Sequence, residues 1–104
     1  MADSYRSSGA LSLILLTYVR PLEDVDAQMK AHVEFLERNM AEGAFLIAGR
    51  RDPRTGGVIV ARGDAKTVEA LAGQDPFVTS GVAEFEVVAF NMSFAQPEIA
   101  GLLA

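Results

Sequence analysis

The stretch that decides the fold is PLEDVDAQMKAHVEFLERNMAEG, residues 21–43. Its apolar residues recur at steps of three and four, which at about 100° per residue places them in one stripe along a helix. The stripe consists of Leu22, Val25, Met29, Val33, Leu36 and Met40. Acidic residues in the first turns and Gly43 after the last one are typical of helix ends. The sequence therefore predicts one helix over residues 21–43, with its apolar stripe on a core.

His32 is the only histidine of the chain, and it lies at the margin of this stripe. We therefore expect its side chain to be half-buried. Because an imidazole gains and loses its proton near neutral pH, His32 is the first candidate for chemistry. The alternative is a histidine that is satisfied at the edge of the core and has no chemical role.

Composition limits the classes of function. A chain of 104 residues, half of them hydrophobic, predicts one domain with one core. A net charge of −5 is the opposite of a nucleic-acid-binding surface, so we expect no nucleic-acid partner. With no cysteine and one histidine we expect no metal site, and no motif indicates a cofactor. The sequence shows neither a signal peptide nor an apolar run of about 18 residues, so we expect a cytoplasmic protein without a membrane partner.

The rest of the chain is organised in short elements. Apolar runs bounded by glycine and proline predict strands at residues 10–18, 44–51, 57–62 and 82–94. The turn at residues 52–56 predicts a hairpin between the second and third strands. Helical spacing over residues 65–73 and the Asp-Pro pair at Asp75 predict two further short helices, closed by glycine. We expect residues 1–9 to be a flexible tail, residues 10–94 the domain, and residues 95–104 a C-terminal tail that is a short helix or an arm.

This order is strand, helix, strand, strand, helix, strand. It predicts an α+β protein, a ferredoxin-like βαββαβ sandwich with both helices on one face of an antiparallel sheet. Both faces of the strands are apolar, as residues 13–16 (LILL) and 58–60 (VIV) show. A bare apolar sheet face is more than soluble monomers usually expose, so we expect a homodimer through the sheet faces.

Four motifs stand in a fixed order along the chain: the helix histidine His32, the Ala48-Gly49 pair in the next strand, the turn ending in Thr55-Gly56-Gly57, and Asp75-Pro76-Phe77 before the last strand. Together they resemble the motifs of the YCII-related (YciI-like) family. The resemblance covers roughly residues 10–94 and implies a dimeric ferredoxin-like α+β barrel. It also implies a catalytic His–Asp dyad in a pocket, which falls on His32 and Asp75. Arg50 departs from the pattern, because family members often carry proline there.

A dyad of this kind suits proton transfer. A carboxylate bonded to one ring nitrogen fixes the tautomer and leaves the other nitrogen to take or give a substrate proton, as in isomerisation or elimination. Asp75 has an alternative role, because an aspartate before proline caps a helix whether or not it contacts a histidine. The sequence is compatible with Asp75 as a cap alone and with Asp75 as both a cap and a partner of His32.

Four further residues are assigned to binding a small-molecule substrate: Tyr18, Gly49, Arg51 and Phe77. Arginines at strand ends could hold a substrate carboxylate, although solvated turn charges are the common alternative. Aromatic residues at strand and helix ends line pockets or simply fill the core. Two functions follow: a cofactor-independent lyase or isomerase acting on a small organic acid, or a non-catalytic dimeric module that binds a metabolite in the same pocket.

Overall fold

The computed structural model of the chain describes residues 10–103, so the tail predicted at residues 1–9 lies outside the described residues. Its elements are, in chain order, β1 (Leu11–Tyr18), α1 (Leu22–Ala27), α2 (Met29–Ala41), β2 (Phe45–Arg50), β3 (Gly56–Arg62), α3 (Ala65–Ala72), α4 (Pro76–Thr79), β4 (Ala83–Phe90) and α5 (Pro97–Leu103). No helix of this part of the chain is long and apolar enough to cross a membrane.

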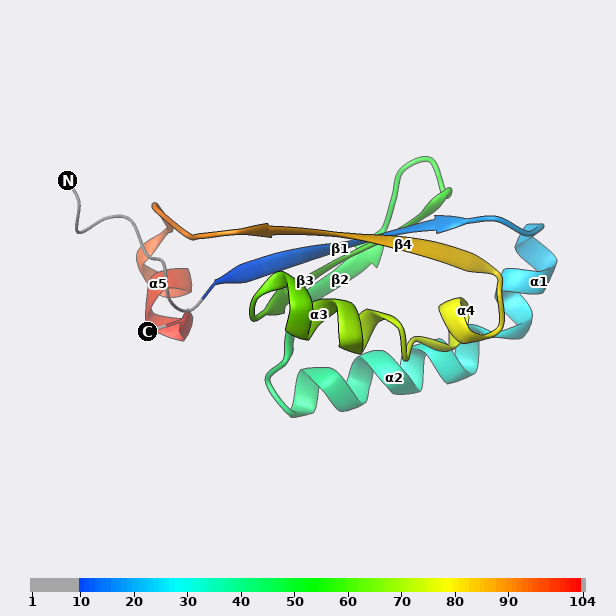
Figure 1. Ribbon diagram of the computed structural model, residues 1–104, viewed down its shortest axis with the longest axis horizontal. Coiled ribbons are helices and arrows are strands. Elements are labelled where there is room, and N and C mark those ends of the chain that lie inside the picture. The colour runs from blue at the N-terminus through cyan, green and yellow to red at the C-terminus, as the bar shows by residue number, and fades with distance from the viewer. Residues whose placement is uncertain (1–9, 104) are drawn as a thin grey trace.

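The predicted ferredoxin-like α+β architecture is confirmed. Four antiparallel strands form one sheet in the order β2-β3-β1-β4, with β2 and β3 joined as the expected hairpin. Helices α2, α3 and α4 lie along one face of the sheet, and the opposite face is left uncovered (Figure 1). Helix α5 lies apart from this layer at one end of the sheet, and none of its described residues is buried (Figure 1).

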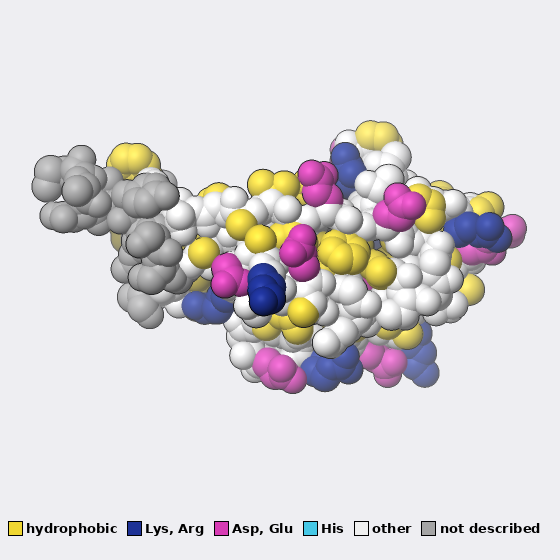
Figure 2. All heavy atoms as spheres, in the orientation of Figure 1, with side chains coloured by type: hydrophobic (Ala, Val, Ile, Leu, Met, Phe, Trp, Pro, Cys, Tyr) yellow, Lys and Arg dark blue, Asp and Glu magenta, His cyan; other side chains and the backbone are white. Residues whose placement is uncertain are grey.

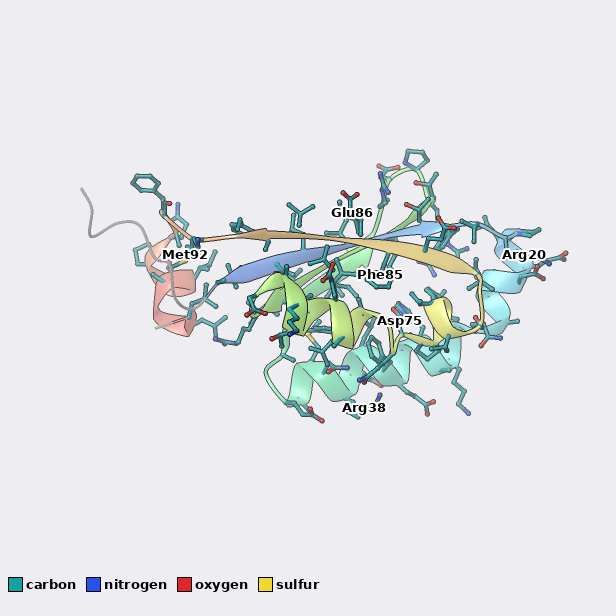
Figure 3. The ribbon with its side chains drawn as sticks, viewed as in Figure 1. Arg20, Arg38, Asp75, Phe85, Glu86 and Met92 are labelled. Atoms are coloured by element: carbon teal, nitrogen blue, oxygen red, sulfur yellow. The ribbon has the colours of Figure 1, made fainter. Side chains whose placement is uncertain are left out.

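Strand register decides which side chains face the helices. Ile14 pairs with Ile59 of β3 and Val87 of β4, and Leu16 pairs with Gly57 and Phe85. Ile14, Leu16 and Ile59 are at most 2% exposed, because this face carries the core. Side chains alternate between the two faces along β4. Phe85 points toward the helices, and the next residue, Glu86, points to the uncovered side of the sheet (Figure 3).

The prediction of a single helix over residues 21–43 is wrong in one respect, because the helix is interrupted at Gln28. Gln28 has φ −101° and ψ 1°, outside the α-helical region, and its N–H bonds three residues back to Val25 O at 3.0 Å. The break lets α1 place Val25 fully in the core before α2 begins. No proline or glycine marks the break in the sequence.

The buried face of α2 is also rotated from the predicted stripe. Its buried residues are His32, Phe35 and Asn39, while Val33 of the stripe is exposed. Asn39 can be buried because its Nδ2 donates a hydrogen bond to Phe35 O at 2.9 Å. His32 is consequently 8% exposed, which is more buried than the half-buried position expected from the sequence.

Strand β4 ends at Phe90, four residues before the predicted end at residue 94. Phe90 pairs with Leu11, the first residue of β1, so the residues that follow have no strand beside them. The backbone groups beyond Phe90 therefore cannot continue the ladder.

The predicted stops and caps are present. Gly43 ends the α2 segment with φ 80°, and Gly81 ends α4 with φ 82°, a left-handed conformation that glycine adopts without a steric cost. Asp64 caps α3 by accepting a hydrogen bond from Thr67 N at 2.9 Å. That bond lowers the pKa of Asp64 below its usual value of 3.8, so the stability it adds is lost only as the pH falls through this lower value.

Candidate active site

The two residues of the expected dyad lie in direct contact. His32 Nδ1 is 2.8 Å from Asp75 Oδ1, although the residues are 43 positions apart in the sequence. Helix α2 carries the histidine on its buried face, and Asp75 stands at the start of α4, which packs beside it. Asp75 is 1% exposed, so the pair is shielded from bulk water on the carboxylate side.

Asp75 makes both of the contacts that the sequence left open. Its Oδ1 also accepts a hydrogen bond from Phe77 N at 2.9 Å, so the carboxylate caps α4 while it contacts His32. Pro76 occupies the first helical position, where its missing N–H costs nothing. The Asp-Pro-Phe motif thus fixes the carboxylate in the orientation that meets the imidazole.

Phe77 fixes the plane of the histidine ring. The two rings stack with centroids 3.8 Å apart and planes 7° apart. Tyr18, at the end of β1, meets Phe77 edge-on with centroids 5.9 Å apart. With Nδ1 held by Asp75 and one ring face held by Phe77, the orientation of the imidazole is determined by its surroundings.

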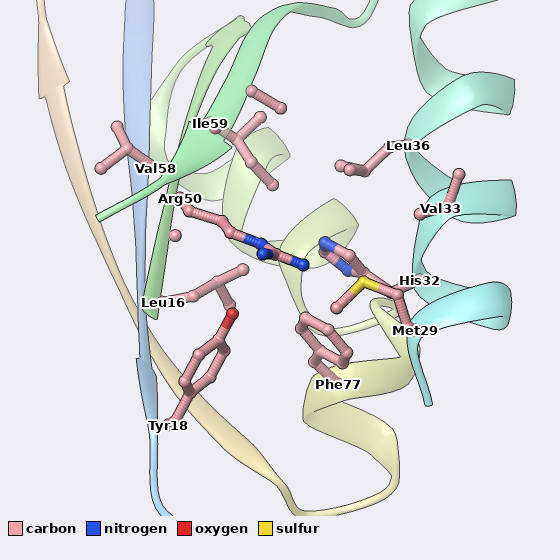
Figure 4. Close-up of a pocket in the computed structure, with 13 residues that line it drawn as sticks. Leu16, Tyr18, Met29, His32, Val33, Leu36, Arg50, Val58, Ile59 and Phe77 are labelled. Carbon is pink, nitrogen blue, oxygen red and sulfur yellow. The ribbon is translucent and has the colours of Figure 1, made fainter. Parts of the chain in front are cut away.

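The histidine lines a cavity of about 210 Å³ between α2 and the sheet (Figure 4). The walls are mostly apolar, and three polar side chains reach the space: Tyr18, His32 and Arg50. The lining residues are Leu16, Tyr18, Met29, His32, Val33, Leu36, Ala48, Gly49, Arg50, Gly57, Val58, Ile59 and Phe77. His32 Nε2 forms no hydrogen bond with another described residue, so this nitrogen remains for a molecule in the cavity.

Three of the four residues assigned to substrate binding line this cavity, namely Tyr18, Gly49 and Phe77. The structure does not place Arg51 there. Its Nη1 donates to Thr17 Oγ1 at 3.4 Å, and Thr17 lies on the uncovered side of the sheet. Successive strand residues point to opposite faces, so the neighbour Arg50 is the arginine that enters the cavity.

The hairpin loop is tied to α1 beside the cavity. Arg54 forms an ion pair with Asp26, and its guanidinium lies 5.9 Å from the centre of the Tyr18 ring. The hydrogen bond that Arg54 donates to the Asp26 carboxylate raises the pKa of Arg54 above its usual value. Arg54 therefore packs against Tyr18, a residue that lines the cavity. Within residues 10–103, no group of three or more acidic or histidine side chains is close enough to hold a metal ion.

Two features of the site were not found from the sequence. The stacking of His32 on Phe77 depends on how α4 packs against α2, and no local sequence pattern predicts that packing. The choice between Arg50 and Arg51 depends on the parity of β2, which is set when Arg50 pairs with Gly57 across the hairpin. The departure from the family pattern at Arg50 was the one sequence signal that pointed to this residue.

Comparison with solved structures supports the same fold. The structure of 5-chloro-2-hydroxyhydroquinone dehydrochlorinase from Burkholderia phenoliruptrix AC1100, in complex with 2,5-dihydroxybenzoquinone, matches with a TM-score of 0.63. The two sequences are 21% identical, and the match covers 82% of this chain and 95% of that chain. Comparison with curated proteins gives no match. The YCII-related domain matches residues 11–91, most of the described chain, and the chain therefore belongs to the YCII-related domain family.

Proposed function

We propose that the chain is a small cofactor-independent enzyme that transfers protons on a small organic acid, in reactions of the lyase or isomerase type. The observation that carries the proposal is the buried 2.8 Å contact between His32 Nδ1 and Asp75 Oδ1, with the other ring nitrogen facing the cavity. An oriented histidine of this kind is the usual general base or acid near neutral pH.

The chemistry assigns one role to each residue. His32 Nε2 accepts a proton from a carbon or oxygen of the substrate, and the resulting imidazolium is stabilised by the Asp75 carboxylate. In an elimination, the freed electron pair forms a double bond as the leaving group departs as an anion. In an isomerisation, the double bond shifts and the imidazolium returns the proton to another carbon. Asp75 is a positioning residue, since it acts through His32.

The likeness in fold supports elimination as the first reaction to test. The matching protein of Burkholderia is a dehydrochlorinase by name, and loss of HCl is an elimination. The test incubates the untagged protein with 5-chloro-2-hydroxyhydroquinone and follows chloride release. In parallel, a panel of small unsaturated acids is incubated in D₂O and examined for deuterium on carbon, which any reversible carbon-to-histidine proton transfer introduces. Chloride release or deuterium incorporation above the uncatalysed rate supports the proposal, and the absence of both contradicts it.

A second function is favoured by the cap formed by Asp75. Because Oδ1 bonds Phe77 N, the carboxylate stabilises α4 even if no proton is transferred. The same cavity then serves a dimeric module that binds a metabolite without converting it. Binding without deuterium incorporation or chloride release separates this function from catalysis.

We also propose that two copies pack through the uncovered sheet face. This face carries apolar side chains from all four strands, and acidic side chains lie among the hydrophobic ones along its β4 margin (Figure 2). The apolar residues are Leu13, Leu15, Ile47, Val58, Val60, Val88 and Phe90, of which Ile47 is 65% exposed. A second copy would cover this face in the self-complementary way of a two-fold dimer.

Dimerisation gives a direct prediction. In sedimentation at micromolar concentration we expect a species of twice the 11.1 kDa chain mass. Val60 lies at the centre of the face, paired with Leu13 and Ile47, so Val60→Asp should weaken association by roughly 3 kcal/mol through an unpaired buried charge. Ala70→Asp, at an exposed position of α3 on the other side of the sheet, is the matched control and should leave the dimer intact. A wild-type species of 11 kDa at this concentration would contradict the proposal.

A further inference from the structure

Arg50 is distinct among the arginines of the described chain because it has no partner. Every other described arginine bonds a neighbour or lies over an aromatic ring, whereas Arg50 forms no hydrogen bond or ion pair with any residue from 10 to 103. The partnered ones are Arg20, Arg38, Arg51, Arg54 and Arg62.

The side chain of Arg50 lines the cavity of His32 while it stays accessible to solvent. Arg50 pairs with Gly57 and shares the helix-facing side of the sheet with Ala48, and its guanidinium is directed across the cavity toward the His32 ring (Figure 4). Gly57 contributes no side chain to this floor, so nothing separates the guanidinium from the open space. The cation and the candidate base therefore face one molecule from two sides.

The charges of the cavity select an anion. The lining residues include no aspartate or glutamate, although the chain as a whole carries a net charge of −5. The net charge of the His32–Asp75 pair is zero when the imidazole is protonated and −1 when the imidazole is neutral. Arg50 adds one positive charge, so the site balances at most one negative charge on a ligand. A planar guanidinium suits a carboxylate or an ionised enol or phenol oxygen.

The size of the cavity limits the rest of the ligand. An apolar protein cavity of about 150 Å³ is known to hold benzene. The cavity here is about 210 Å³ and is not fully enclosed, so one ring with a small substituent fits inside it and a second fused ring would extend toward its opening. Its apolar walls, including Met29, Leu36 and Phe77, suit the faces of such a ring.

From these observations we infer that Arg50 is a specificity-determining residue, which anchors the anionic oxygens of a single-ring monoanion and so presents the ring to His32. The inference rests on the proposed function in using the same cavity, and it adds the substrate class and the residue that selects it. It concerns binding, so it can be tested without knowing the reaction.

The test uses benzoate as the charged probe, benzamide as its uncharged isostere and 2-naphthoate as the larger anion. Binding is followed by the NMR resonances of the His32 ring, the only histidine of the untagged chain, and by calorimetry. We expect saturable binding of benzoate and at least about tenfold weaker binding of benzamide and 2-naphthoate, since a charge-assisted hydrogen bond or the fit is lost.

Two variants separate a local contact from overall charge. Arg50→Gln should abolish the preference for benzoate over benzamide. Arg51→Gln removes the same charge one residue away, on the opposite face, and should keep the preference. Equal binding of benzoate and benzamide to the wild type, no saturable benzoate binding, or an equal effect of both variants would overturn the inference. Naphthoate binding as tight as benzoate binding would overturn its single-ring part.

The outcome is independent of the proposed function. If benzoate binds through Arg50 and no proton transfer is found on any compound, the anion site stands and the enzyme proposal falls. If proton transfer is found on a substrate and benzoate binds no more tightly than benzamide, the enzyme proposal stands and the proposal of an anion site at Arg50 is wrong.

Discussion

His32→Asn is expected to reduce turnover by about 10²–10⁴-fold, which is the usual contribution of a general acid or base. The change is chosen because the asparagine amide can still donate to Asp75 from near the position of Nδ1, whereas it cannot exchange a proton with a substrate near neutral pH. The loss should therefore appear in kcat with the fold intact. The assay is chloride release or deuterium incorporation, with circular dichroism and thermal melting as controls.

Asp75→Asn tests the second member of the pair in the same assay. Asparagine caps a helix about as well as aspartate, so α4 should survive, but the charge that stabilises the imidazolium is removed. Asp64→Asn is a matched control, because Asp64 is also a helix cap with a 2.9 Å bond, whereas the carboxylate that contacts His32 is that of Asp75. We expect Asp75→Asn to lower turnover and Asp64→Asn to leave it unchanged. Equal effects of the two variants on turnover would mean that Asp75 acts only as a helix cap.

Gly56→Ala is expected to have the largest effect on stability. A Cβ at Gly56 would lie 1.8 Å from Leu16 O and 2.7 Å from Leu16 C, which are backbone atoms of the neighbouring strand β1. The two strands must separate to admit it, at a cost of roughly 3 kcal/mol or more in the free energy of unfolding. For a domain of this size that corresponds to a fall in Tm of roughly 12 °C or more.

Gly49→Ala is the control for this substitution. A Cβ at Gly49 meets no atom within 4 Å, so the same change in the adjacent strand should alter stability by no more than about 0.5 kcal/mol. Both variants are melted at one protein concentration, because association makes Tm depend on concentration. If Gly56→Ala melts at the wild-type temperature, the close approach of β3 to β1 is not as the structure places it.

Sequence patterns predicted the fold well because the local signals agree with one another. Asp64 and Asp75 cap the helices that follow them, and Gly43 and Gly81, which precede β2 and β4, adopt the expected left-handed conformation. Each of these signals depends on the backbone conformation of a few neighbouring residues. The sequence therefore contains them in full.

What the sequence did not predict depends on contacts between distant elements. Phe35 was left out of the apolar stripe and Asn39 was not expected in the core, yet both are buried because α2 packs at a rotation set by the sheet and by α4. The pairing of Arg50 with Gly57 decides which of two adjacent arginines enters the cavity. A shift of one residue would exchange them, and no local signal excludes that shift.

The central claim is that Asp75 holds His32 with Nδ1 as the donor, so that Nε2 faces the cavity without a proton. Long-range ¹H–¹⁵N NMR of the single histidine measures this directly, because the shifts of the two ring nitrogens report which of them carries the proton in the neutral ring. At a pH where the ring is neutral, we expect the Nδ1–H tautomer, with Nε2 free to accept a substrate proton. A neutral ring protonated at Nε2 would place the proton of the 2.8 Å contact on Asp75 or break that contact, and it would contradict the account.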